Sequence, residues 1–142
     1  MTIGAILGGK GDEVVSVGCD TSVRDAIAKL AEHRIGAMPV LRDAKVAGIM
    51  SERDVIHCLK TDGAAILDWK VERVMTAPAI TVTREVSVLA ALSMMTKRRV
   101  RHLPVVEGER VVGIVSIGDL VKYRIDRIEQ EAEAMRAYIQ SA

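Results

Sequence analysis

The stretch GIMSERD, residues 48–54, occurs a second time as GIVSIGD, residues 113–119, with Gly, Ile, Ser and Asp at the same places. The second stretch starts 65 residues after the first, and this offset superimposes residues 14–59 on residues 79–124 without a gap. The self-similarity indicates an internal duplication, and two copies are too few for an open repeat array. We therefore expect two copies that face each other around one core. Identical pairs include Val17/Val82, Ser22/Ser87, Pro39/Pro104, Gly48/Gly113 and Asp54/Asp119.

The pattern of each copy predicts the order β-α-β-β-α. In the first copy, VVSV (14–17) favours a short strand. Ser22, with Asp25 three residues later, forms a capping box that begins a helix. The runs MPVL and VAGIM, separated by the polar turn RDAK, are typical of a β-hairpin, and Ser51 begins a second helix. The second copy repeats this order, with AITV (79–82) as its first strand. The sequence thus predicts an α+β fold.

The predicted organisation has five segments. They are an N-terminal helical segment (1–11), the first motif (12–62), a linker helix (63–75), the second motif (76–127) and a C-terminal tail helix (128–142). The long final helix is expected to start near residue 119. Its apolar residues step by four and three, which is a heptad spacing. Because it is too short for a free-standing coiled coil, we expect it to pack on its own domain or on a second subunit. These heptad residues are Val121, Ile125, Ile128, Ala132, Met135 and Ile139.

The stretch GAILGGKG (4–11) is close to a phosphate-binding loop, but Gly11 stands where that loop needs Ser or Thr. A buried strand should also precede such a loop, and only three residues stand before this one. A short helix that docks on the body is therefore the preferred interpretation. Its apolar residues at helical spacing are Ile3, Ile6 and Leu7.

Composition excludes several classes of function. The 142 residues include 20 basic and 19 acidic side chains, so no net charge favours nucleic acid or an acidic membrane. Neither an apolar run of about 18 residues nor a signal peptide is visible. Cys19 and Cys58 form no CxxC pair, which suggests reduced thiols in a cytoplasm. The three histidines are scattered, so no metal site is predicted. His57 is expected to face away from Ser51, so no catalytic pair and no enzyme activity are expected.

The two Gly-Ile-x-Ser-x-x-Asp stretches are the best candidates for an anion site. Ser51 and Ser116 are placed to cap helices, and the first turn of a helix has free N–H groups and a dipole that attract phosphate. Asp54 and Asp119 could accept hydrogen bonds from the two hydroxyls of a ribose. A plain capping motif with no ligand explains the same pattern, so both interpretations stay open.

The order of the motifs resembles a tandem CBS-domain pair, or Bateman module. VMT stands before the second copy, MPVL and LPVV stand in the middle strands of the two copies, and GIxSxxD stands before the last helix of each. The resemblance covers about residues 12–127. It implies that the two motifs pack through their sheets about a pseudo-two-fold axis and leave two clefts for adenosine-containing ligands. The first cleft would combine Ser51, Arg53 and Asp54 with Ala79, Ile80, Arg101, His102, Leu103 and Pro104. The second would combine Ser116 and Asp119 with Val14, Val15, Gly36, Ala37, Met38 and Pro39.

The resemblance also implies a role for the chain. Such pairs sense AMP, ADP, ATP, S-adenosylmethionine or NAD(H) and regulate a partner. No enzyme or transporter is part of this sequence, so that partner is expected to be another protein or a second copy in a homodimer. Arg53, Arg101 and His102 all fall at the first cleft, so tighter phosphate binding is expected there than at the Asp119 cleft. Ile80 and Val15 would flank adenine. A structural or protein-interaction module with empty clefts is the alternative.

Overall fold

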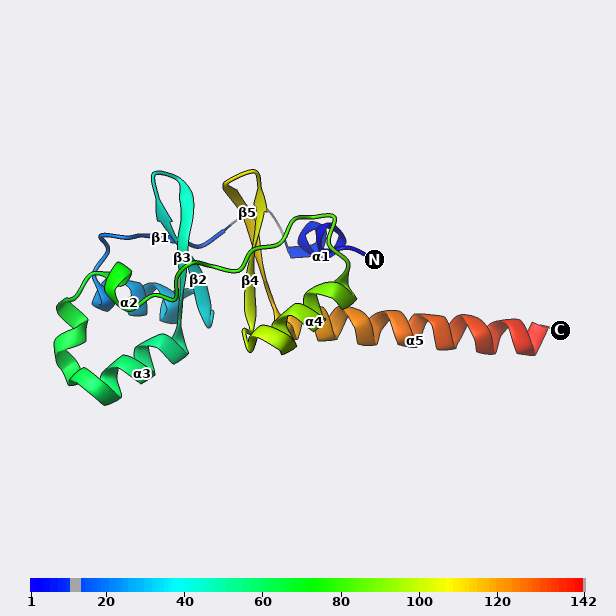
Figure 1. Cartoon of the computed structure of the whole chain (residues 1–142). Coiled ribbons are helices and arrows are strands. Elements are labelled where there is room, and N and C mark those ends of the chain that lie inside the picture. The colour runs from blue at the N-terminus through cyan, green and yellow to red at the C-terminus, as the bar shows by residue number, and fades with distance from the viewer. Residues whose placement is uncertain (11–13, 142) are drawn as a thin grey trace.

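The computed structural model of the chain describes residues 1–10 and 14–141. Two similar halves lie side by side, and the last helix extends far beyond them (Figure 1). The first half contains β1 (Val17–Gly18), α2 (Val23–His33), β2 (Ala37–Arg42), β3 (Lys45–Ser51) and α3 (Glu52–Asp62). The second contains α4 (Val88–Arg98), β4 (His102–Glu107), β5 (Arg110–Ser116) and α5 (Ile117–Ser141). The α+β fold of two duplicated motifs is thereby confirmed.

The strands form one sheet in the order β1-β2-β3-β5-β4. Each half is a tight antiparallel hairpin, and the two hairpins share the same register and the same irregularity after their fourth pair. The halves join where Lys45 of β3 pairs with Arg110 of β5. These residues are equivalent in the duplication, and a pseudo-two-fold axis between the halves brings equivalent residues together in this way.

The predicted strand at VVSV (14–17) is shorter than expected, because β1 contains only Val17 and Gly18, and the predicted strand at AITV (79–82) is wrong. Val82 makes a single parallel bridge to Val105, at the place equivalent to the pairing of Val17 with Val40. Its N–H donates to the carbonyl of Pro104 at 3.0 Å, and its carbonyl accepts from Val106 at 2.9 Å. Because Pro104 has no N–H, the ladder cannot continue toward Ile80.

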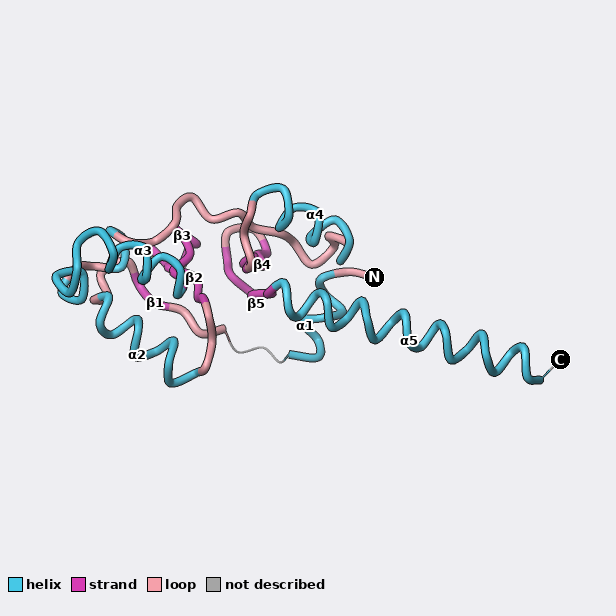
Figure 2. Tube along the Cα trace, turned by 90° about the horizontal axis from the view of Figure 1, so that it is seen from below, coloured by secondary structure: helices cyan, strands magenta, loops and turns pink. Residues whose placement is uncertain are grey.

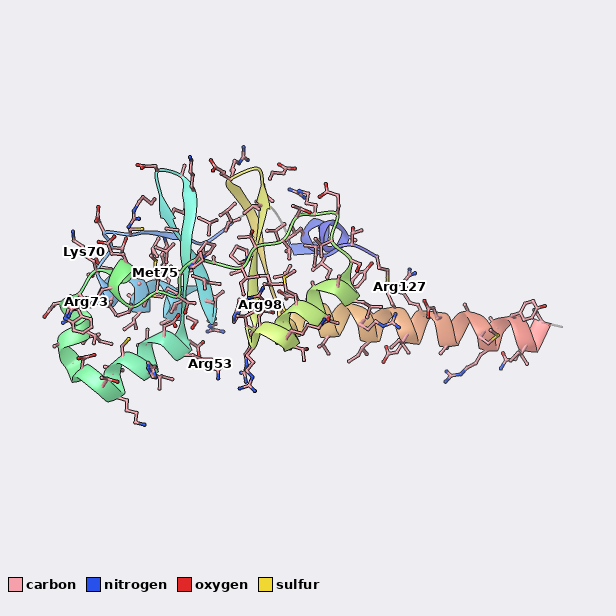
Figure 3. All side chains as sticks on the ribbon, in the orientation of Figure 1. Arg53, Lys70, Arg73, Met75, Arg98 and Arg127 are labelled. Carbon is pink, nitrogen blue, oxygen red and sulfur yellow. The ribbon has the colours of Figure 1, made fainter. Side chains whose placement is uncertain are left out.

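The predicted linker helix (63–75) is helical, but of the 3₁₀ type rather than the α type. The segment forms two short 3₁₀ helices, η1 (Gly63–Asp68) and η2 (Val71–Arg73). The backbone is extended at Trp69 and Lys70, where Lys70 bridges to Ser22 of the first motif. The guanidinium of Arg73, labelled in Figure 3, lies 3.5 Å from the centre of the Trp69 ring and stacks on it.

The N-terminal helix α1 (Ile3–Lys10) confirms the helical interpretation of the first residues. It packs on the second half in the same way that the linker packs on the first half. The Ile3 N–H donates to the Val86 carbonyl at 2.9 Å, and the Val71 N–H donates to the equivalent Thr21 carbonyl at 2.8 Å. Each half therefore packs against a short helical segment that precedes the other motif in the chain: α1 packs on the second half and the linker packs on the first.

This segment is part of the core in both halves. The first buried cluster includes Val71 and Val74 of the linker, and the second includes Ile3, Ile6 and Leu7 of α1. Ile3 and Val71 are fully buried.

We expect Ile3→Ala to lower the free energy of unfolding by about 2 kcal/mol, because it leaves a cavity at a fully buried position. Urea denaturation followed by circular dichroism would measure this loss. The exposed Met1→Ala variant is the control and should unfold as the parent chain does. Equal stability of the Ile3→Ala variant would show that α1 is not part of the folded core.

The final helix runs from Ile117 to Ser141 without a break. The predicted boundary between the second motif and the tail helix, at residue 128, therefore does not correspond to a change in the helix. Leu120 is buried and Tyr123 is half-buried against the second motif. From residue 125 to residue 141 every side chain is exposed. A view turned by 90° shows the same separation of α5 from the body (Figure 2). The end of the helix therefore does not pack on its own domain.

Candidate functional site

A cavity of about 540 Å³ lies where the two halves meet, on the side of Asp54. This size is in the range of small-molecule sites. Its walls come from the end of β3, from α3, from the chain after η2 and from the turn between α4 and β4. The lining residues named in the sequence analysis are Ser51, Arg53, Asp54, Ala79, Ile80, Arg101 and His102, together with Gly36.

Asp54 is held by three hydrogen bonds. Its Oδ2 accepts from the Ser51 N–H at 2.9 Å and from the Ser51 hydroxyl at 3.0 Å. Its Oδ1 accepts from the Thr76 hydroxyl at 2.9 Å. A carboxylate offers about four acceptor positions, so a ribose diol would take the remaining one and compete with Thr76 for another. The sequence indicated the Ser51 cap but not Thr76, because Thr76 lies 22 residues away in the chain.

The first turn of α3 is less open to an anion than the capping motif suggested. The Glu52 N–H donates to the Gly36 carbonyl at 2.9 Å, and the Asp54 N–H donates to the Ser51 hydroxyl at 3.3 Å. Two of the N–H groups that normally attract phosphate at a helix start are therefore already used. The equivalent helix start in the second half has the same arrangement, with Ile117 donating to the Arg101 carbonyl.

Positive charge is concentrated on one side of the cavity. Arg53, Arg101 and His102 line it as predicted from the resemblance, and Arg99 joins them. Figure 3 shows Arg53 extending from the start of α3 toward the second half. The sequence analysis missed Arg99, although it belongs to the basic run KRRVR at residues 97–101. Arg99 ends α4 with a left-handed backbone (φ 55°), and this turn places it on the cavity wall.

The opposite wall is mainly apolar. Ile49, Val74, Ala79 and Ile80 line it, with Val100 beside the arginines. The cavity thus combines an apolar surface, an anionic Asp54 and several cations. Glu52 also lines it and adds a second negative charge.

The expectation that His57 faces away from the Ser51 region is wrong, because His57 lines this cavity together with Cys58. Both follow Asp54 on the same face of α3, three and four residues later. Burial, followed by the carboxylates of Asp54 and Asp62, raises the pKa of the Cys58 thiol. The thiol is therefore protonated at neutral pH and is a poor nucleophile.

The residues expected at the Asp119 cleft are less exposed. Ala37, Met38 and Pro39 are buried within β2, and Val14 and Val15 are half-buried. Gly36, expected here, lines the Asp54 cavity. Leu103 and Pro104, expected at the Asp54 cleft, are buried in β4 and do not line that cavity. Ser116 and Asp119 form the same cap as their equivalents, with the Ser116 N–H donating to Asp119 Oδ2 at 2.8 Å.

Two features are absent from the described residues, 1–10 and 14–141. Within them, no group of three or more His, Cys, Asp and Glu side chains is arranged to hold a metal ion. No helix among them has the length and apolar character needed to cross a membrane.

The sequence model of the CBS domain matches the chain twice, at residues 11–61 and 71–126. The chain therefore belongs to the CBS-domain family and carries a tandem pair of these domains. It is 39% identical to the CBS-domain containing protein ATU1752 from Agrobacterium tumefaciens, whose crystal structure superimposes with a TM-score of 0.82. That match covers 87% of this chain and 92% of the other.

Two other relatives bear on function. The chain is 36% identical over 126 residues to the mitochondrial CBS domain-containing protein CBSX3 of Arabidopsis thaliana, covering 85% of this chain but 61% of that protein. It is 25% identical to the CBS domain pair of protein MJ0100, with a TM-score of 0.77, and covers 98% of that chain and 87% of its own. The MJ0100 crystal structure is a complex with 5′-methylthioadenosine and S-adenosyl-L-methionine. CBS pairs of this type are generally regulatory, and adenosine-type ligands occur among them.

Proposed function

We propose that this chain is a non-enzymatic regulatory module that binds an adenine nucleotide in the Asp54 cavity. The observation that carries this proposal is the convergence of Asp54, an apolar wall and the arginines on one cavity between two motifs. Asp54 would hold ribose hydroxyls, and Ile80 would contact the adenine ring. Arg53, Arg99 and Arg101 would contact phosphates, because guanidinium groups bind phosphate oxygens in pairs.

The cations favour a ligand with several phosphates. AMP, ADP, ATP and NAD(H) share the adenosine that the cavity would recognise, and they differ in phosphate charge. We therefore propose tighter binding of ADP, ATP or NAD(H) than of AMP, and tighter binding of AMP than of adenosine. The Asp119 side has Gly118 where the first motif has Arg53, so we propose weaker binding there.

Isothermal titration calorimetry with adenosine, AMP, ADP, ATP and NADH tests this proposal. We expect Arg101→Ala to weaken ATP binding by about tenfold, the contribution of one charge-assisted contact, and to leave adenosine binding unchanged. Arg98→Ala is the matched control, because Arg98 lies in the same basic run but does not line the cavity. The absence of binding for all five compounds would contradict the proposal.

The alternative is a structural or protein-interaction module with empty clefts. One observation favours it, since Ser51 and Thr76 already bind both oxygens of Asp54. In that case Asp54 only stabilises α3 and the linker, and the calorimetric signal is absent.

We also propose that a second copy of the chain is a partner. Ligand binding across the two motifs would then be transmitted as a change in the homodimer or in the surface offered to another protein. A ligand has such an effect only by binding one of two states more tightly than the other.

A further inference from the structure

The heptad residues of α5 form an apolar seam that the described residues of the same chain leave largely exposed. Its side chains range from 42% exposed at Val121 to 65% exposed at Ile139. The face of α5 that contacts the body is a different one, with Leu120 buried and Tyr123 half-buried. At about 100° per residue, the seam and the body-facing side lie roughly a third of a turn apart. We define the α5 seam as Val121, Ile125, Ile128, Ala132, Met135 and Ile139.

The seam fixes the heptad positions of the neighbouring charges. Val121, Ile128 and Met135 occupy d positions, and the other seam residues occupy a positions. The flanking g positions then hold Arg124 and Glu131, and the flanking e positions hold Lys122, Glu129 and Arg136. The charged side chains beyond the body are exposed, and their pairs within the helix are long, with Arg127 to Glu131 at 4.0 Å and Arg136 to Glu133 at 3.5 Å.

These charges are complementary in one orientation of two identical helices. In a parallel, in-register pair, each g residue lies beside the e residue five positions later on the partner. Arg124 then meets Glu129 of the second copy, and Glu131 meets Arg136. The two-fold symmetry repeats both contacts, so four pairs of opposite charge flank the seam.

An antiparallel arrangement with all six seam residues in contact lacks this match. It would place e beside e and g beside g across the pair. With the seam residues in contact, Glu129 would lie beside Glu129 of the partner and Lys122 beside Arg136. Like charges at these positions are unfavourable.

We propose that α5 pairs with α5 of a second copy as a parallel, in-register coiled coil along this seam. This inference rests on the proposed homodimer and adds its orientation and register, independently of any nucleotide. The parallel arrangement places both bodies at the same end of the pair. Since the seam spans fewer than three heptads, contacts between the bodies must contribute to dimer stability as well.

Analytical ultracentrifugation of the full chain tests whether two copies associate through the α5 seam. We expect a particle of twice the 15.4 kDa chain. Glu129→Lys should raise the dimer dissociation constant at least about tenfold, because it places Lys beside Arg124 at two symmetric sites. The double variant Arg124→Glu, Glu129→Lys should restore association. Asp126→Lys is the matched control, since it makes the same kind of change on the face of α5 away from the seam.

Disulfide trapping tests the orientation. Met135→Cys should cross-link readily between two copies on oxidation, because a parallel pair places this d position beside itself. Glu133→Cys lies outside the seam and should cross-link poorly. A monomer would overturn both the homodimer and this inference. A dimer whose dissociation constant is unchanged by Glu129→Lys, or that fails to cross-link at position 135, would overturn the α5 pairing and leave the homodimer intact.

Discussion

Asp54→Ala is expected to weaken adenine-nucleotide binding at least about 100-fold. Two ribose hydroxyls that donate to a carboxylate contribute about 1.5–3 kcal/mol each, and each 1.4 kcal/mol changes affinity about tenfold. The same substitution removes the acceptor for Ser51 and Thr76. We therefore also expect the free energy of unfolding to fall by about 1–2 kcal/mol, the range for a lost cap and one further hydrogen bond. Calorimetry on protein checked for folding by circular dichroism measures both effects.

Two variants separate binding from capping. Asp119→Ala removes the equivalent cap in the second motif and should cost similar stability, while nucleotide binding in the Asp54 cavity is retained. Asp54→Asn keeps an acceptor for the cap but removes the negative charge, and it should weaken binding with a smaller loss of stability. If Asp54→Ala and Asp119→Ala weakened binding equally, Asp54 would not be the ribose ligand.

Gly48→Ala is expected to lower the free energy of unfolding by about 3 kcal/mol. A Cβ at this position would lie 2.6 Å from the carbonyl oxygen of Thr76 and 2.8 Å from the sulfur of Met75. The backbone there is fixed by two hydrogen bonds of 2.9 Å between Thr76 and Ile49. Overpacking costs about 1–3 kcal/mol, and each disturbed backbone bond costs about 1 kcal/mol more. Because Thr76 lines the cavity, displacement of its backbone would distort the cavity wall, and nucleotide affinity should fall as well.

Gly113→Ala is the matched comparison, since Gly113 is equivalent to Gly48 in the duplication. Its new Cβ would lie 2.6 Å from Leu7 Cδ2, the end of a side chain that can rotate away. We expect a change within about 1 kcal/mol and normal nucleotide binding. Urea denaturation of both variants gives the comparison. Equal losses would show that the linker backbone yields as easily as the Leu7 side chain does.

Much of the fold could be predicted because the pattern of each element occurs twice in the duplicated sequence. Both hairpins, the helices begun by Ser22, Ser51 and Ser87, and the long last helix are all local patterns. The sequence analysis missed the relation between α1 and the linker, because their offset is 68 residues (Ile3 to Val71) and differs from the offset of 65 elsewhere. The strand at residues 79–82 failed for a non-local reason, the missing N–H of Pro104 on the neighbouring strand.

The site was predictable only in part, because some of its residues are placed by contacts between segments far apart in the sequence. Asp54 follows from a motif that both copies share, whereas the placement of Arg53 and Arg101 in one cleft is implied by the resemblance to CBS-domain pairs. Thr76 and Arg99 could not be found in this way, because their places depend on how the linker crosses β3 and how α4 ends. Gly36 was expected only at the Asp119 cleft, but it lies beside His102 of the other motif and so also lines the Asp54 cavity.

The different partners of Gly48 and Gly113 follow from how the motifs are joined. Two identical, unlinked motifs would form two identical clefts, and any change in one cleft would occur in the other. In this chain the linker packs on the first motif, whereas α1 packs on the second. The two sides therefore differ chemically, and a substitution in the segment that packs on one side can leave the other side unchanged. Tandem fusion thus lets the two sides of one small protein diverge independently.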